Sequence, residues 1–200
     1  FVSGDPSFSK KLGITQHCIA SLRFAANRRE IFGYFLTLQA NIDFWEILES
    51  EIMRSSAIKN NFLRFERLLS KTIPIILYDN AHPDCFAISI DKNRFDRVNS
   101  DELEVFFSNY SRKITQNPGT FKDINKSIND SFQKWTRFHL SKYLVINDFD
   151  MIIPSKSLII ELKRVVERIE DWRPYLDDKG NYLALSKICS TNHLRMHTIA

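Results

Sequence analysis

The sequence has 200 residues, of which 44% are hydrophobic and 26% are charged, and its net charge at pH 7 is +4. This composition is typical of a globular domain and excludes a disordered chain, a collagen-like repeat and a coiled-coil array. Because the sequence has only five glycines, a sandwich of many strands joined by tight turns is also disfavoured.

The cysteines, the apolar runs and the net charge indicate the cellular compartment and the class of partner. Three widely spaced cysteines, an odd number, predict a reducing compartment, the cytoplasm or the nucleus, without a disulfide framework. No apolar run reaches the roughly 18 residues that a membrane span needs, so we expect no membrane partner. The charge permits a polyanionic partner without requiring one. Because the sequence begins with Phe1, we treat it as a processed or partial chain and read no targeting signal into it.

The first 70 residues are predicted to form a helical region. Apolar residues recur at helical spacing in three stretches, 19–24, 32–48 and 60–70. At the start of this region, residues 8–22 resemble a helix-turn-helix, with Gly13 where the turn requires a positive φ. Its second helix would present four polar side chains to the major groove of DNA, namely Thr15, Gln16, His17 and Ser21. An ordinary helical hairpin is the alternative interpretation.

The middle of the chain is predicted to contain two strands followed by two helices. Apolar, β-branched residues at 73–78 and 85–90 flank a loop-forming segment and predict short strands. A helix is expected to start at Asn99, whose side chain can cap it, with Glu102 at the third position of a capping box. A second, longer helix is expected over 120–143.

The segment that contains the candidate catalytic and metal-binding residues is predicted to be a β-hairpin. Two apolar runs, 143–146 and 158–160, flank a turn-like Pro-Ser-Lys-Ser at 154–157. If the turn is centred between Ser155 and Lys156, the numbers of paired residues sum to 311. Asp150 then lies opposite Glu161, and Asp148 lies opposite Lys163. Because side chains alternate along a strand, all four would share one face of the sheet.

Opposed carboxylates on one face of a sheet repel each other and destabilise it. A divalent cation between Asp150 and Glu161, with Asp148 as a further candidate ligand, would reverse the sign of this interaction, and oxygen ligands suit Mg²⁺ or Mn²⁺. A lysine beside such a metal can orient or deprotonate a water molecule, while the metal stabilises the charge that develops on a phosphodiester. This arrangement therefore predicts metal-assisted hydrolysis of a phosphodiester bond.

Asp150, eleven positions before Glu161-Leu162-Lys163 on an apolar strand, resembles the motif of the PD-(D/E)XK nuclease superfamily. The resemblance implies a restriction-endonuclease-like core in which Asp150 and Glu161 hold the metal. It also implies that the carbonyl of Leu162 can add a ligand and that Lys163 is the catalytic lysine. The motif is short, and the resemblance covers about a quarter of the chain.

The sequence departs from the family pattern ahead of the aspartates, where Asn147 and Phe149 stand in place of proline. Asp148 is therefore a rival to Asp150. An amphipathic helix over 158–172 is an alternative interpretation of this segment, because the apolar residues of the segment also fit a helical stripe. In a helix, Glu161 and the lysine two positions later would point roughly 200° apart, and the site could not form.

Downstream of the motif, a loop over 172–182 carries aromatic and basic residues and leads into a helix expected over 181–189. Its Arg173 is a candidate contact to nucleic acid, although such residues more often fix a loop to the core.

The fold is predicted to be α+β, or α/β, with a helical N-terminal half packed on a small mixed sheet. Residues 1–70 would form the helical region and residues 71–200 the nuclease-like core, or the whole chain would be one domain. The favoured function is a Mg²⁺- or Mn²⁺-dependent endonuclease, a hydrolase that acts on DNA. A non-catalytic nucleic-acid-binding protein and a helical interaction protein are the alternatives. Nucleic acid is the expected partner, and a homodimer is left open.

Overall fold

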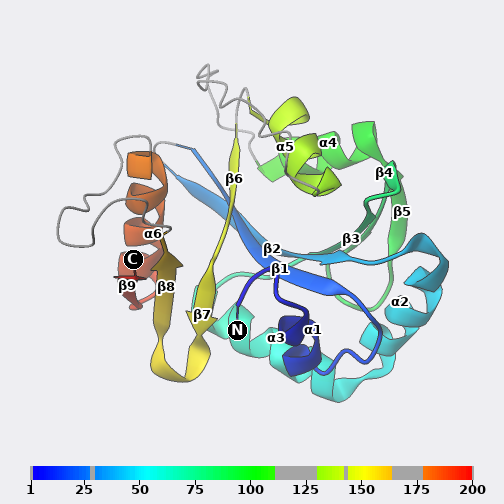
Figure 1. The fold of residues 1–200 in the computed structure, drawn as a ribbon, viewed down its shortest axis with the longest axis horizontal. Helices are drawn as coiled ribbons and strands as arrows, with labels where there is room; N and C mark the ends of the chain where they lie inside the picture. Colours follow the sequence, from blue (N-terminus) through cyan, green and yellow to red (C-terminus); the bar gives the residue numbers. More distant parts are fainter. Residues whose placement is uncertain (1, 28–29, 111–129, 142–143, 164–177, 200) are drawn as a thin grey trace.

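The computed structural model describes residues 2–27, 30–110, 130–141, 144–163 and 178–199 (Figure 1). Its centre is a six-stranded sheet with the strand order β5-β4-β3-β2-β1-β6. In this sheet β2 and β3 are parallel, and every other neighbouring pair is antiparallel. The strands are β1 (Ile19–Ala26), β2 (Ile31–Gln39), β3 (Ile75–Asp79), β4 (His82–Ser89), β5 (Asp96–Asn99) and β6 (Val145–Asp148).

Helices cover both faces of this sheet (Figure 1). Side chains alternate along the strands, so Leu22 and Phe24 of β1 join one buried cluster and Ala25 joins the other. The first cluster contains residues of α1 (Pro6–Leu12), α2 (Trp45–Arg54) and α3 (Ser56–Leu69). The second contains residues of α4 (Ser100–Tyr110) and α5 (Ser131–His139).

A second sheet of three strands, in the order β7-β8-β9, lies beside the first (Figure 1). The chain enters it directly from β6, because only Phe149 and Asp150 separate β6 from β7. The main-chain nitrogen of Phe149 donates a 3.0 Å hydrogen bond to the carbonyl of Leu22, which ties this crossing to β1. The elements of this part are β7 (Met151–Ile153), β8 (Leu158–Leu162), α6 (Lys179–Thr191) and β9 (Arg195–Ile199).

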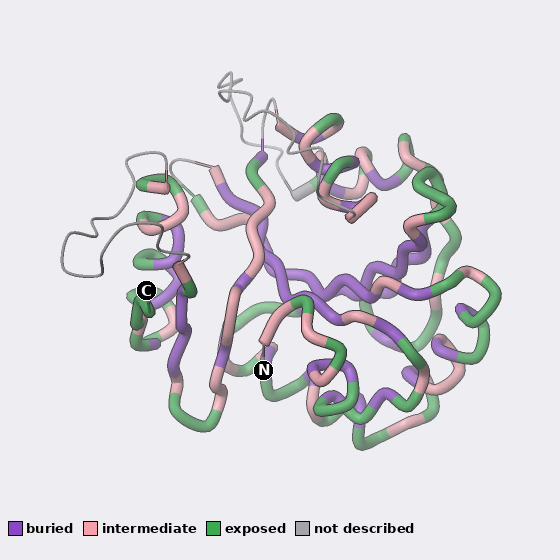
Figure 2. The backbone as a smooth tube through the Cα atoms, in the orientation of Figure 1, coloured by how far each residue is buried: buried purple, intermediate pink, exposed green. Residues whose placement is uncertain are grey.

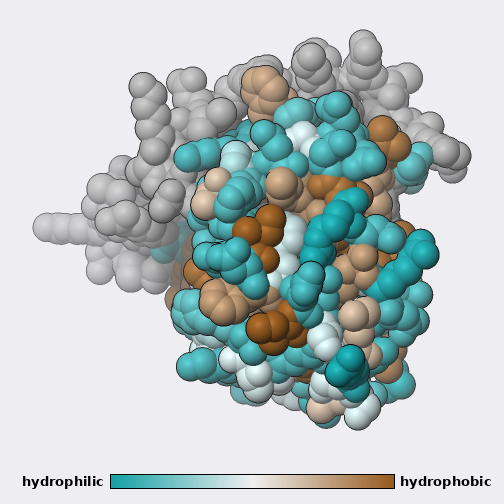
Figure 3. Space-filling model, turned by 90° about the vertical axis from the view of Figure 1, so that its right-hand side faces the viewer, coloured by the Kyte–Doolittle hydropathy of each residue, from teal (hydrophilic) through white to brown (hydrophobic). Residues whose placement is uncertain are grey.

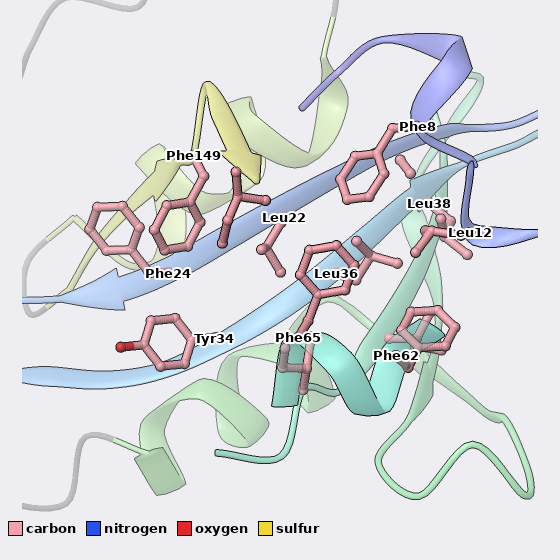
Figure 4. Close-up of a cluster of buried hydrophobic side chains, with 14 of the residues drawn as sticks. Phe8, Leu12, Leu22, Phe24, Tyr34, Leu36, Leu38, Phe62, Phe65 and Phe149 are labelled. Atoms are coloured by element: carbon pink, nitrogen blue, oxygen red, sulfur yellow. The ribbon is translucent and has the colours of Figure 1, made fainter. Parts of the chain in front are cut away.

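The first cluster is the larger core. It lies between the two sheets on one side and the helices α1 and α3 on the other. Phe149 packs against Phe24 and Tyr34, with ring centroids 5.0 and 6.1 Å apart. Figure 4 shows these rings in one buried cluster with aromatic residues of α1 and α3. The central strands β1, β2 and β3 are buried along most of their length, while the helices alternate between buried and exposed residues (Figure 2). On the side of the molecule shown in Figure 3, hydrophobic residues are interspersed with hydrophilic ones. Among the described helices, none has the length and the apolar character that crossing a bilayer requires.

The predicted α+β class is confirmed, but the helical N-terminal half is only partly correct. Residues 45–69 are helical, as expected, whereas the helical spacing at 19–39 belongs to β1 and β2. Both strands lie between other strands and have helices on both sides, so β1 is buried at every position after Ile19. A strand buried on both faces has a continuous apolar run, and this run does not distinguish a strand from a buried helix.

The predicted helix-turn-helix is also wrong, because part of its expected second helix lies in strand β1. Its first helix exists as α1, and Gly13 ends that helix with φ = 91°, the positive value that the motif led us to expect. The segment after it is a loop that leads into β1, so no second helix is available to enter a groove of DNA. The two regions expected to separate at residue 70 also share one sheet, because β2 pairs with β3 and β1 pairs with β6.

Several local predictions are confirmed. The strands expected at 73–78 and 85–90 correspond to β3 and β4, and the helix expected over 181–189 corresponds to α6. Asn99 and Glu102 form the reciprocal capping box: Glu102 N donates to Asn99 Oδ1 at 3.0 Å, and Asn99 N donates to Glu102 Oε2 at 2.9 Å. Much of the helix expected over 120–143 lies outside the described residues, and its described part contains α5.

Candidate active site at the end of the β7–β8 hairpin

The turn and the register of the predicted hairpin are present, but its first strand is β7 and not the apolar run 143–146, of which Val145 and Ile146 belong to β6. The paired residues, whose numbers sum to 311, are Met151 with Ile160, Ile152 with Ile159, and Ile153 with Leu158. A short 3-10 turn, η2 (Pro154–Lys156), joins the strands, and Ser157 closes it with φ = 47°. Because β8 is a strand through Leu162, the alternative helix over 158–172 is wrong for these first five residues. The rest of that range lies beyond Lys163 and mostly outside the described residues.

The register brings Asp150 and Glu161 to the end of the hairpin away from its turn. The main-chain nitrogen of Leu162 donates a 2.8 Å hydrogen bond to Asp150 Oδ2, which fixes the Asp150 carboxylate beside the end of β8. The Glu161 side chain is buried, with 3% of the residue exposed. Burial raises the pKa of Glu161; the Lys163 ammonium opposes this shift, and the nearby carboxyl of Asp150 adds to it.

Lys163 is the cation of this cluster. Its Nζ lies 2.7 Å from Oε1 of Glu161 and 3.1 Å from Oδ2 of Asp178. Its main-chain nitrogen donates a 2.8 Å hydrogen bond to the carbonyl of Ile199 at the end of β9. Partial burial acts to lower the pKa of Lys163, but the hydrogen bonds to the two carboxylates outweigh it, and the pKa is raised. The side chain is therefore a protonated donor at neutral pH.

The first turn of α6 supplies three more polar side chains. Residues 178, 181 and 182 stand at spacings of three and four, so they share one face of the helix. Asn181 Nδ2 donates a 2.8 Å hydrogen bond to Glu161 Oε1, and the Tyr182 ring centroid lies 5.1 Å from Lys163 Nζ. Asp178 occupies the N-cap position but makes no capping hydrogen bond with its side chain. Its carboxylate binds Lys163 instead.

Two oxygen atoms on this face are buried without a partner. Asn181 Oδ1 and Tyr182 Oη have no hydrogen-bond partner within the described ranges. A buried polar atom in this condition costs about 1–3 kcal/mol. Asp178, Asn181 and Tyr182 were not predicted as site residues from the sequence. The signal that could have identified them is their shared helix face, because α6 is the first described helix after the motif strand.

Asp148, the rival ligand, lies in a different environment. The predicted pairing of Asp148 with Lys163 is wrong, because β6 leaves the hairpin and pairs with β1, where Asp148 stands opposite Arg23. The Arg23 guanidinium is buried and lies 3.1 Å from Asp148 Oδ1 and 2.7 Å from Asp130 Oδ2. Asp148 is therefore bound to the six-stranded sheet, and Asp150 is the aspartate beside Glu161.

The residues proposed to bind DNA do not form a recognition helix. Thr15 and Gln16 lie in the loop after α1, where their main-chain nitrogens donate to the Glu51 carboxylate at 2.7 and 3.4 Å. His17 is exposed in the same loop, and Ser21 is buried in β1. Arg173 lies outside the described residues.

The donor set at the hairpin end fits a hard divalent cation. Mg²⁺ is usually held by one or two carboxylates, with water completing an octahedral shell. Asp150 and Glu161 are such a pair, and the carbonyl of Leu162 is a third oxygen at the same strand end. The described residues contain no cluster of three or more His, Cys, Asp and Glu side chains suited to a metal, so water would have to provide the remaining ligands.

No protein-family model, curated protein or solved structure matches this chain. The resemblance to PD-(D/E)XK nucleases therefore rests on the residues of the hairpin alone.

Proposed function

We propose that this protein is a metal-dependent nuclease that hydrolyses phosphodiester bonds in DNA. The observation that supports this most directly is the meeting of three motif residues at one strand end. Asp150 is held beside β8 by Leu162, and Lys163 Nζ lies 2.7 Å from the buried carboxylate of Glu161. A buried carboxylate with a raised pKa beside a second carboxylate is typical of a functional site.

In this proposal Asp150 and Glu161 would hold Mg²⁺ or Mn²⁺. The cation, when bound, would supply a more acidic water molecule and stabilise negative charge on the phosphate. Lys163, as an ammonium group, donates a hydrogen bond that orients the attacking water or a phosphate oxygen. The water oxygen forms a bond to phosphorus, the bond from phosphorus to the leaving oxygen breaks, and the proton of the water passes to solvent or to the leaving oxygen.

Asn181 keeps the Glu161 carboxylate in position. Its amide nitrogen donates a 2.8 Å hydrogen bond to Glu161 Oε1, the same oxygen that Lys163 contacts. A ligand carboxylate fixed by a neighbouring donor binds a metal at a lower cost in side-chain ordering.

The test is a cleavage assay with the purified chain on supercoiled plasmid, linear duplex, single-stranded DNA and RNA. Each polymer is incubated with Mg²⁺, with Mn²⁺ and with EDTA. The proposal predicts cleavage of DNA that needs the metal and stops in EDTA. Cleavage of RNA alone would change the proposed substrate, and a folded chain that leaves all four polymers intact would refute the proposed function.

A further inference from the structure

The first turn of α6 is built for polar contacts that the described chain does not complete. Its N-cap aspartate, Asp178, binds Lys163 rather than its own helix, and two further side chains on the same face carry buried oxygen atoms without a partner. Buried polar atoms in folded proteins are nearly always hydrogen-bonded, so an unpartnered pair at one place calls for a ligand.

The chemistry of these atoms indicates which ligand each can take. The Tyr182 hydroxyl is a donor as well as an acceptor, whereas the Asn181 amide oxygen, Oδ1, only accepts. Lys163 Nζ lies 5.1 Å from the centre of the Tyr182 ring, so the ammonium group contacts the same side chain that carries the hydroxyl. Two hydrogen-bond donors together, one of them charged, favour an anionic acceptor with several oxygens.

We propose that Tyr182 is a catalytic residue whose hydroxyl donates a hydrogen bond to a non-bridging oxygen of the scissile phosphate, beside the ammonium group of Lys163. This inference rests on the proposed phosphodiester hydrolysis. A donor placed at this oxygen stabilises the charge that increases as water attacks phosphorus, so its contribution is larger in the transition state than in the bound substrate. Tyr182 therefore acts on the rate of cleavage more than on the affinity for DNA.

The Tyr182→Phe variant separates this role from a structural one. The substitution removes only the hydroxyl and keeps the ring beside Lys163. Because that hydroxyl has no partner among the described residues, its removal leaves no other polar group unpaired, and the variant should unfold at the same temperature as the wild type or a higher one. A matched control is Tyr34→Phe, since the Tyr34 hydroxyl accepts a 3.3 Å hydrogen bond from Asn192, at the other end of α6.

The experiment measures the single-turnover cleavage rate with Mg²⁺, the affinity for a DNA duplex with Ca²⁺ in its place, and the thermal unfolding of each protein. We expect Tyr182→Phe to cleave at least about tenfold more slowly than the wild type, with unchanged or increased thermal stability. Tyr34→Phe should cleave at the wild-type rate.

Three results would overturn the inference. A Tyr182→Phe rate within about twofold of the wild type would mean that an ordered water molecule alone satisfies the hydroxyl. A rate that falls only in proportion to lost thermal stability would mean a structural role. A wild type that does not cleave DNA, whether or not it binds DNA, would refute the proposed function together with the inference, whereas the first two results, obtained with a wild type that cleaves, would refute the inference alone.

Discussion

Lys163 Nζ lies 2.7 Å from Glu161 Oε1, and the two residues are separated by one position in the chain. This contact depends on β8 being a strand, because side chains two positions apart project from the same face of a strand. The parallel strand β9 holds β8 in place up to its C-terminal end, because Lys163 N donates a 2.8 Å hydrogen bond to Ile199 O. The geometry of the candidate site is thus a consequence of strand pairing on both sides of β8.

Glu161 is expected to cost the protein stability at neutral pH. Because its folded-state pKa is raised above the ordinary value of 4.5, the folded chain binds the proton more tightly than the unfolded chain. Stability is therefore gained as the pH falls through the raised pKa and lost as it rises. Glu161→Gln, which mimics the protonated carboxyl, should raise the Tm at neutral pH and flatten its pH dependence above pH 4.5.

Thermal unfolding of the two proteins across the acid-to-neutral range checks this prediction. Each 1 kcal/mol corresponds to about 2–4 °C in Tm for a chain of this length. Mg²⁺ should raise the Tm of the wild type and leave that of Glu161→Gln unchanged, because only an intact site binds the ion. A lower Tm for the variant at neutral pH would show that the ion pair with Lys163 outweighs the cost of burial.

The two aspartates of the Asp-Phe-Asp segment should differ sharply when each is changed to asparagine. Asp150 lies beside Glu161, and loss of a metal ligand removes several kcal/mol of transition-state stabilisation, which corresponds to at least about a hundredfold in rate. Asp148 binds Arg23 in the six-stranded sheet, so Asp148→Asn should cleave within about threefold of the wild type. Calorimetric titration should show that Asp150→Asn weakens Mg²⁺ binding more than Asp148→Asn does. Equal losses of cleavage rate in both variants would indicate that Asp148 also belongs to the site.

Asp178 is expected to control the alkaline side of the rate profile. The Lys163 pKa is raised by hydrogen bonds to Glu161 and Asp178, so Asp178→Asn should lower it toward the ordinary value of 10.5. If the ammonium form is the active one, the cleavage rate of the variant should begin to fall at a lower pH than that of the wild type. Asparagine is also a good N-cap residue, so α6 should remain intact. Superimposable profiles would show that Asp178 does not influence Lys163.

Arg23 should be essential for stability but not for chemistry. Its buried guanidinium pairs with Asp130 and Asp148, and its Nε donates a 3.0 Å hydrogen bond to Thr37 Oγ1. Removing one partner from a buried ion pair costs about 3–5 kcal/mol, so Arg23→Met should lower the free energy of unfolding by that order. Denaturant unfolding measures the change.

The matched control for Arg23 is an arginine whose ion pair is exposed. Arg94 lies 3.4 Å from Asp96, and its side chain is 79% exposed. Arg94→Met should therefore change the free energy of unfolding by less than about 1 kcal/mol. Similar losses in the two variants would contradict the importance assigned to the buried pair.

The local features of the fold could be predicted from the sequence. Turn chemistry at Pro154 and apolar runs on either side were enough to give the register of the β7–β8 hairpin, and with it the neighbours Asp150 and Glu161. The capping box at Asn99 was equally local, because both partners lie within four residues of each other.

The features that depend on distant parts of the chain could not be predicted. Residues 19–39 form two strands buried on both faces, and their apolar runs fit a helix as well as a strand. The apolar run before Asp148 pairs with β1 instead of β8. More than 100 residues separate β1 from β6 in the sequence, so no local pattern predicts this pairing. The α6 residues join the site through tertiary packing, which no spacing within the motif strand encodes.

The most direct test of the proposed site is the cleavage of plasmid DNA by Lys163→Ala with Mg²⁺, compared with Lys179→Ala as a matched control. Lys179 is an exposed lysine in the first turn of α6. We expect the wild type and Lys179→Ala to cleave at the same rate and folded Lys163→Ala to be slower by at least about a hundredfold. Cleavage by folded Lys163→Ala at the wild-type rate would contradict the account.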